Sequence, residues 1–149
     1  MVHICERIGA LLAGLDVPAA VPEDQCPVHW AEQVAKAACE ASCGRDVMCR
    51  DGMFQLYLIL RDIARGKGRA RDLELIPELC ALIQETAGCD LAVQAARQIA
   101  ALAEQRQELW RAHVLRRLCR PGVCPMPAPE GAGQTQQPTL RRRRRGAAQ

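Results

Sequence analysis

The sequence predicts an all-α fold: an antiparallel four-helix bundle, preceded by an extra N-terminal helix and followed by a disordered C-terminal tail. Apolar residues recur every three or four positions through most of the 149-residue chain, which is the spacing of one face of an α-helix. No segment alternates apolar and polar residues as a half-buried strand does, and no Asn-Gly hairpin turn is present. Hydrophobic residues make up 49% of the chain but aromatic residues only 3%, so we expect a core packed mainly with aliphatic side chains.

Residues 1–28 are predicted to form a short amphipathic helix followed by a linker. The apolar residues at helical spacing in the segment 2–15 are Ile4, Ile8, Leu11, Leu12 and Leu15. Pro18, Pro22 and Pro27 then interrupt the chain, and such a proline-rich stretch is typical of a loop.

Residues 29–124 are predicted to form the bundle. Its helices are expected over about residues 29–40, 52–65, 72–87 and 90–120, and the last of them is the longest. Glycine follows each of the first three helices and proline follows the fourth. Because the connections are short, consecutive helices are expected to run antiparallel.

Residues 125–149 are predicted to be a disordered tail. The composition changes there to Pro, Gly, Gln and Ala, and the segment 141–145 consists of five arginines. Without those five positive charges, the net charge of the chain changes from +3 to −2. No aromatic residues are interleaved with the arginines, so we do not expect nucleic acid as a partner. The run is expected to dock on an acidic partner surface or to aid solubility.

The cellular compartment is predicted from two absences in the sequence. No stretch approaches the ~18–20 apolar residues of a membrane span, and the N-terminus has neither the basic start nor the cleavage site of a secretion signal. We therefore expect no membrane insertion and a cytoplasmic location. Because thiols stay reduced in the cytoplasm, the nine cysteines are expected to serve a metal or redox site rather than a disulfide framework.

Three side chains that can bind a metal follow one another at a spacing of three residues: Cys43, Asp46 and Cys49. They lie in a glycine-containing loop between two predicted helices, where all three can turn towards one point. This spacing is typical of a loop that holds an iron–sulfur cluster, which then needs a further ligand from elsewhere. Cys89 lies in the loop two helices later, at the same end of an up-down bundle, so we expect it to converge with the other three.

The segment from about residue 30 to residue 110 resembles the C-terminal iron–sulfur domain of the NADH-binding flavoprotein subunit of complex I. The same domain recurs in NAD-linked hydrogenases and formate dehydrogenases. The matching positions occur in the family's order and spacing and are Ser42-Cys43-Gly44, Cys49-Arg50, Gly52, Leu56, Leu60, Ile63, Gly66-Lys67-Gly68, Asp72-Leu73 and Cys89. The resemblance implies a four-helix bundle whose cysteines hold one 4Fe-4S cluster adjacent to a flavin.

The chain departs from the family pattern at two points. Asp46 stands where the family has its second cysteine, and a carboxylate is a harder ligand than a thiolate. The expected cofactor is therefore a 4Fe-4S cluster with Asp46 on the fourth iron, a 3Fe-4S cluster, or a cluster with one iron open to solvent. The preceding glycine-rich folds that bind NADH and FMN in the family are missing, so the resemblance implies a free-standing cluster module.

Two further cysteines and two residues near the ligand loop are candidates for supporting roles. Cys119 and Cys124 flank a Pro-Gly turn, which could fold them around a metal or into a second redox pair; otherwise they are exposed thiols at the end of the bundle. Cys39 lies one helical turn before Cys43 and could face the cluster. Arg50 could offset the negative charge of the cluster.

The remaining cysteines and histidines are expected to have no part in the cluster. Cys80 falls on the apolar face of its helix and is expected in the core. Cys26 has only His29 at a ligand-like spacing, which is a weak signal. Cys5 has no ligand-spaced partner, and His113 is expected to be solvated or to cap a helix.

These observations predict an electron-transfer iron–sulfur subunit that relays electrons between a flavin- or NADH-linked partner and another redox protein. Its expected partners are flavoprotein or other redox subunits of an oxidoreductase complex. No Ser-His-Asp set, glycine-rich phosphate loop or paired-carboxylate pocket is visible, so we expect no catalytic site of its own. The alternative is a metal-stabilised interaction or redox- and iron-sensing module that holds zinc or a labile cluster.

Overall fold

A computed structural model describes residues 17–127 of the chain. In this range it contains helices and no strand, which confirms the predicted all-α class. The elements in chain order are α2 (Pro27–Ala41), the π-helical turn η1 (Met48–Gly52), α3 (Met53–Ala64), α4 (Asp72–Thr86), α5 (Asp90–Glu104) and α6 (Gln107–Leu115). The helix predicted over residues 2–15 and nearly all of the predicted tail, residues 128–149, lie outside the described part of the chain.

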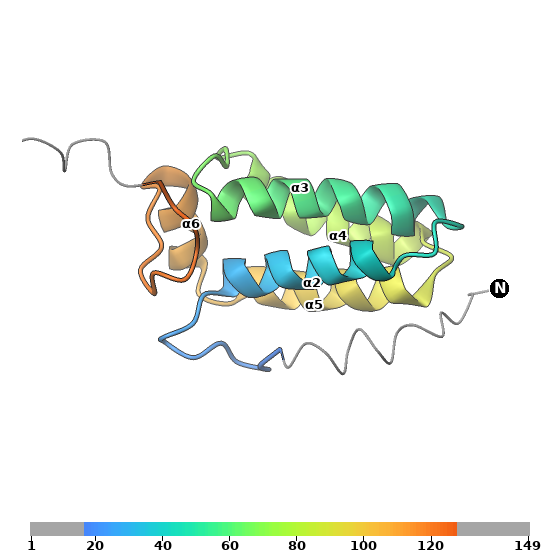
Figure 1. Cartoon of the computed structure of the whole chain (residues 1–149), viewed down its shortest axis with the longest axis horizontal. Coiled ribbons are helices and arrows are strands. Elements are labelled where there is room, and N and C mark those ends of the chain that lie inside the picture. The colour runs from blue at the N-terminus through green and yellow to red at the C-terminus, as the bar shows by residue number, and fades with distance from the viewer. Residues whose placement is uncertain (1–16, 128–149) are drawn as a thin grey trace, which may run out of the picture.

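Four of the helices lie side by side, and α6 lies across one end of them (Figure 1). The helix α2 packs against α3 and α5, and α4 packs against α5 and α3. The chain runs up and down through α2, α3, α4 and α5, so consecutive helices are antiparallel. One end of this bundle therefore carries the loop between α2 and α3 together with the loop between α4 and α5.

The core is aliphatic, as the near absence of aromatic residues predicts. Four residues of α3 that recur at helical spacing are all fully buried, namely Met53, Leu56, Leu60 and Ile63. The buried faces of α2 and α5 instead contain many alanines, namely Ala31, Ala35 and Ala38 in α2 and Ala92, Ala95 and Ala96 in α5. Small side chains on facing helices allow the two backbones to approach closely, which explains how α2 and α5 share an extensive contact.

The glycine pair after α3 ends the helix and turns the chain towards α4. Gly66 has a left-handed φ of 71°, its N–H donates to the carbonyl of Ile63, and the N–H of Lys67 donates to the carbonyl of Asp62. These are the two hydrogen bonds of a Schellman motif. A Cβ on Gly68 would lie 2.6 Å from Cγ1 of Ile63, so the second glycine is required by close packing.

The prediction of a single long helix over residues 90–120 is wrong, because the structure has two helices there. The chain breaks between α5 and α6, where Arg106 adopts a left-handed φ of 48°. The Gln105 side chain accepts the N–H of Val21 at 2.9 Å and donates to the carbonyl of Ala19 at 3.0 Å. These partners lie 84 and 86 residues earlier in the chain, and helical periodicity carries no information about such contacts.

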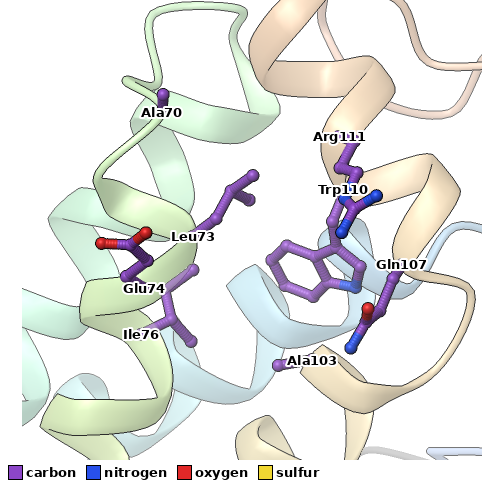
Figure 2. Close-up of a pocket in the computed structure, with 8 residues that line it drawn as sticks. All are labelled: Ala70, Leu73, Glu74, Ile76, Ala103, Gln107, Trp110 and Arg111. Carbon is purple, nitrogen blue, oxygen red and sulfur yellow. The ribbon is translucent and has the colours of Figure 1, made fainter.

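A cavity of about 340 Å³ lies where α6 crosses the end of the bundle (Figure 2). Leu73 and Ile76 of α4 point towards the ring of Trp110, and Arg111 borders the opposite side. The Trp110 Nε1–H donates to the carbonyl of Leu102 at 3.2 Å, which fixes α6 against the end of α5. No cysteine or histidine lines this cavity, so it is separate from the predicted ligands.

No helix in residues 17–127 combines the length and the apolar character that a membrane span requires.

Candidate functional site

The predicted ligands are carried by two loops at the same end of the bundle. Cys43, Asp46 and Cys49 lie between the end of α2 and the start of α3, and Cys89 immediately precedes α5. Figure 1 shows both loops at the end away from α6. The antiparallel helices therefore bring together residues that are 40 positions or more apart in the sequence.

Asp46 connects the two loops. Its Oδ1 accepts the backbone N–H of Cys49 at 2.7 Å, and its Oδ2 accepts the backbone N–H of Gly88 at 3.0 Å. A carboxylate offers about four lone-pair sites, so these two hydrogen bonds leave acceptor capacity on Asp46. The Asp46 side chain therefore fixes the position of the Cys49 backbone relative to the backbone of Gly88, the residue before Cys89.

Cys49 lies in the π-helical turn η1, which leads directly into α3. Such wide turns occur mostly as single insertions in α-helices, frequently at functional sites. Gly52 closes the turn, and a Cβ at this position would lie 3.1 Å from Cε of Met48 and 3.4 Å from Cγ1 of Ile83. The glycine thus lets the wide turn pack closely against α4.

The thiols of Cys49 and Cys89 are buried next to each other. Their residues are 2% and 5% exposed, respectively, and the Cys49 thiol donates to Oγ of Ser42 at 3.5 Å. Burial, with a smaller contribution from the adjacent Cys89 thiol, raises the pKa of Cys49 to about 12, although the hydrogen bond to Ser42 opposes the shift. Without a cation the Cys49 thiol stays protonated at neutral pH, whereas metal coordination deprotonates a thiol outright.

Cys43, the third predicted cysteine ligand, is exposed. It lies between Ser42 and Gly44, where the N–H of Gly44 donates to Oγ of Ser42 at 3.3 Å and Gly44 has a left-handed φ of 77°. The set of three thiols and one carboxylate on adjoining loops fits the ligand chemistry of an iron–sulfur cluster. In the described range these four side chains do not place their ligand atoms within 4.8 Å of one another, as binding of a single ion would require.

The two residues expected to support the ligand loop lie beside it. The Arg50 guanidinium donates to the carbonyl of Gly44 at 3.1 Å and makes two bonds to Asp51, at 2.8 and 2.9 Å. Cys39 is half-buried, and burial raises its pKa to about 11. Both residues border a hollow of about 310 Å³, which Phe54 also lines.

Cys119 and Cys124 are buried, so the predicted alternative that they are exposed thiols is wrong. They are 7% and 8% exposed, and they lie with Cys26 and His113, whose exposures are 1% and 0%. The four ligand atoms of these side chains are all within 4.8 Å of one another. No disulfide joins the cysteines of residues 17–127. The Cys124 thiol donates to Cys26, and this contact lowers the pKa of Cys26 and raises the pKa of Cys124.

Sequence reasoning missed two members of this cluster. Cys26 lies with His113, 87 residues away, rather than forming a site with His29, and His113 is buried instead of solvated. The local spacing from His113 through Cys119 to Cys124 was visible in the sequence, but the contribution of Cys26 depends on the tertiary fold. Cys80 is fully buried, as expected for a core thiol, and burial raises its pKa to about 12.

Comparison with known proteins identifies relatives of the bundle. Residues 29–113 match the family described as the NADH-ubiquinone oxidoreductase-F iron-sulfur binding region. The chain is 32% identical over 102 residues to the HndC component of the NADP-reducing hydrogenase of Solidesulfovibrio fructosivorans, an alignment that covers 68% of this chain and 21% of the relative.

Two further relatives belong to NADH-quinone oxidoreductases. The chain is 30% identical over 97 residues to the NADH-quinone oxidoreductase F subunit of Streptomyces coelicolor, covering 65% of this chain and 22% of the relative. It is 29% identical over 111 residues to the second such F subunit of Rhizobium meliloti, covering 74% of this chain and 26% of the relative. The chain thus spans about a fifth to a quarter of the length of these relatives.

Proposed function

Because the chain belongs to the family of the NADH-ubiquinone oxidoreductase-F iron-sulfur binding region, we propose that it is an electron-transfer subunit whose cofactor is one 4Fe-4S cluster. Cys43, Cys49 and Cys89 are its thiolate ligands, and Asp46 is the fourth ligand. The observation that carries this assignment is the link that Asp46 makes between the loop of Cys49 and the loop of Cys89. All four residues lie inside the segment that matches the family.

Each part of the loop has a distinct role in holding the cluster. When bound, such a cluster accepts and releases one electron at a time. Cys49 and Cys89 supply buried thiols from which the bundle excludes water, whereas Cys43 supplies a thiol at the surface. Arg50 lies beside the loop, where two bonds to Asp51 already balance its positive charge. Its bond to the Gly44 carbonyl also fixes the backbone after Cys43.

The partners that we propose are redox proteins that dock at the ligand end of the bundle. The relatives are named as subunits of NADH-quinone oxidoreductase and of a hydrogenase, which supports a place between a flavin- or NADH-linked donor and a second redox protein. Val47 and Phe54 are 58% and 48% exposed and lie close to the predicted ligands in sequence. We propose that a partner docked at this end of the bundle covers these two side chains.

We further propose that residues 29–124 are the cluster-binding domain. The segment 29–113 that matches the family falls within it and supports this boundary. Cys26 packs on the same unit through His113, so the folded body also includes residues just before this range.

The direct test is the metal content of the full chain purified without oxygen. We expect about four iron and four sulfide per chain and a paramagnetic signal on one-electron reduction. Cys49→Ser and Cys89→Ser should each lose most of the iron, whereas Cys80→Ser, which alters a buried thiol outside the site, should keep it. A folded wild-type chain that contains zinc in place of iron at these residues would instead support the alternative of a metal-stabilised interaction or sensing module.

A second substitution tests the ligand assigned to Asp46. Asp46→Cys restores the family's four-cysteine set, so we expect a stable 4Fe-4S cluster with a lower reduction potential, because a thiolate donates more charge to iron than a carboxylate does. An unchanged potential and unchanged electron paramagnetic resonance spectrum would show that residue 46 does not bind the cluster.

A further inference from the structure

A second group of metal-binding side chains lies at the end of the bundle opposite the predicted cluster ligands. Cys26 immediately precedes α2, His113 belongs to α6, and Cys119 and Cys124 follow α6. Figure 1 shows that the start of α2, the helix α6 and the chain after α6 meet at this end. All four residues are at least nine-tenths buried. From this arrangement we propose that Cys26, His113, Cys119 and Cys124 bind one zinc ion.

The spacing of the ligand atoms matches a single tetrahedral ion. The Cys26 Sγ lies 3.5 Å from His113 Nε2, His113 Nε2 lies 3.3 Å from Cys124 Sγ, and the two sulfurs are 3.8 Å apart. Zinc binds sulfur at about 2.3 Å and nitrogen at about 2.0–2.1 Å. A regular tetrahedron with those bonds has S···S edges of about 3.8 Å and S···N edges of about 3.5 Å. Zinc therefore fits between these atoms with little movement.

The ring of His113 is oriented for coordination through Nε2. Its Nδ1 lies 2.7 Å from the backbone carbonyl of Leu109, so Nδ1 carries the proton and donates it to that oxygen. In this neutral tautomer the lone pair of Nε2 points at the cysteines. A hydrogen bond from the far ring nitrogen to a backbone carbonyl is the usual support of a metal-bound histidine.

The donor set selects zinc over the other common ions. Three sulfurs and one imidazole whose ligand atoms lie within 4.8 Å of one another form the donor set of a structural zinc site. Calcium and magnesium prefer oxygen ligands, and none of these four side chains supplies one. A disulfide is a poorer explanation of the cluster. It would need two sulfurs at about 2.05 Å, whereas the Cys26 and Cys124 sulfurs are 3.8 Å apart, and it would use neither the third thiol nor the imidazole.

The site is independent of the proposed electron-transfer role. The match to the family covers residues 29–113, so His113 is its last residue and the three cysteines lie outside it. The zinc ion would join the segment before α2 and the segment after α6 to one point on the bundle. We infer that this chain uses zinc to fix the two segments that flank the family's domain.

The test is the zinc content of the full chain and its response to paired variants. We expect about one zinc per chain beside the iron, with Cys124→Ser losing the zinc and retaining the iron. Cys49→Ser should do the reverse, which separates failure of the zinc site from failure of the proposed cluster. Cys80→Ser, a control that removes a buried thiol elsewhere, should keep both metals.

Two further measurements keep the result decisive if Cys124→Ser does not fold. His113→Cys leaves four thiolates, which also form a zinc site, so it should fold and bind one zinc ion. After zinc removal, the wild-type chain should bind one Co²⁺ with the intense visible bands of tetrahedral thiolate coordination, and zinc should displace it. A folded wild-type chain with no zinc and no cobalt binding, or with iron bound by these four residues, would overturn the proposal.

Discussion

Asp46 joins the two loops that carry the predicted ligands through both oxygens of its carboxylate. Its two oxygens accept short hydrogen bonds from the backbone of Cys49 and of Gly88, and a thiol is a weak acceptor for such bonds. A carboxylate at position 46 therefore links the two ligand loops in a way that a thiol could not. The structure supports a role for Asp46 in the shape of the site whether or not its carboxylate binds iron.

The structural part of this role can be measured without the cofactor. Asp46→Ala removes both hydrogen bonds and leaves the N–H of Cys49 without its acceptor, so we expect the free energy of unfolding of the iron-free chain to fall by about 1–3 kcal/mol. Urea titration followed by circular dichroism gives the value. Asp51→Ala, which removes only an exposed pair with Arg50, is the matched control and should change the free energy of unfolding much less, because exposed ion pairs contribute little to stability. Equal effects of the two variants would contradict the linking role.

Glu32, on the buried face of α2, should make the stability of the bundle depend on pH. It is 8% exposed, and burial raises its pKa although His29 and Arg65 oppose the shift. A raised folded-state pKa means that its stabilising contribution is present at low pH and is lost as the pH rises through the folded pKa. Glu32→Gln should therefore be more stable than the wild type at pH 8, and this advantage should shrink towards pH 5.

The control for Glu32 lies on the same helix. Glu40 is exposed, so Glu40→Gln should leave the stability within about 0.5 kcal/mol of the wild type at both pH values. Urea titrations of the three proteins at pH 5 and pH 8 provide the comparison, and any effect of pH on bound metal is shared by all of them. If the free energies of unfolding of Glu32→Gln and the wild type differ by the same amount at both pH values, burial does not raise the pKa of Glu32.

At the scale of the elements, helical periodicity predicted most of the bundle. The buried residues of α3 and the buried residues Ile76, Cys80 and Ile83 of α4 recur at helical spacing, whereas Leu73 and Leu79 on the apolar face of α4 are only partly buried. The ends of α3 and α4 could also be predicted, because glycine and local hydrogen bonding terminate helices. The break between α5 and α6 could not, since Gln105 and Arg106 are held there by residues 17–25.

The loop between α3 and α4 allows a test of why the second glycine of the Gly-Lys-Gly motif is needed. Gly68→Ala would place Cβ 2.6 Å from Cγ1 and 3.0 Å from Cα of Ile63. Because the second contact is with the backbone, a rotamer change cannot relieve it, and we expect a loss of about 1–3 kcal/mol in the free energy of unfolding. Lys67→Ala, at the exposed position between the glycines, should change it by less than about 0.5 kcal/mol. A Gly68→Ala variant as stable as Lys67→Ala would contradict the close packing.

At the scale of the whole molecule, the predicted ligands and the zinc-binding cluster differ in how much of them the sequence reveals. Cys43, Asp46 and Cys49 are neighbours in the chain, and the up-down order of the helices is enough to bring the loop of Cys89 to the same end. Cys26 has no such signal, because a long separation in sequence must be closed by the packing of α2 against the segment around α6. Local spacing therefore finds the first group of residues and only part of the second.

The bundle also separates the two centres in space. Cys26 precedes α2 and Cys43 follows it, and a helix of 15 residues is about 22 Å long at about 1.5 Å per residue. No residue belongs to both groups, and mutations at distant sites with no shared partners usually have additive effects. The zinc ion should therefore act on stability and leave the properties of the cluster unchanged.

This separation predicts opposite outcomes for stability and for redox behaviour. A ligand present at about 100 times its Kd contributes about 2.7 kcal/mol, which for a domain of this size corresponds to about 10 °C in Tm. Cys124→Ser should therefore lower Tm by about 10 °C relative to the zinc-loaded wild type, while the reduction potential and the electron paramagnetic resonance spectrum of the reduced cluster stay the same. Scanning calorimetry and a redox titration of the same preparation measure the two quantities. A shifted potential in Cys124→Ser would mean that the two ends are coupled through α2, because the bundle would then transmit a change at Cys26 to the loop that begins at its far end.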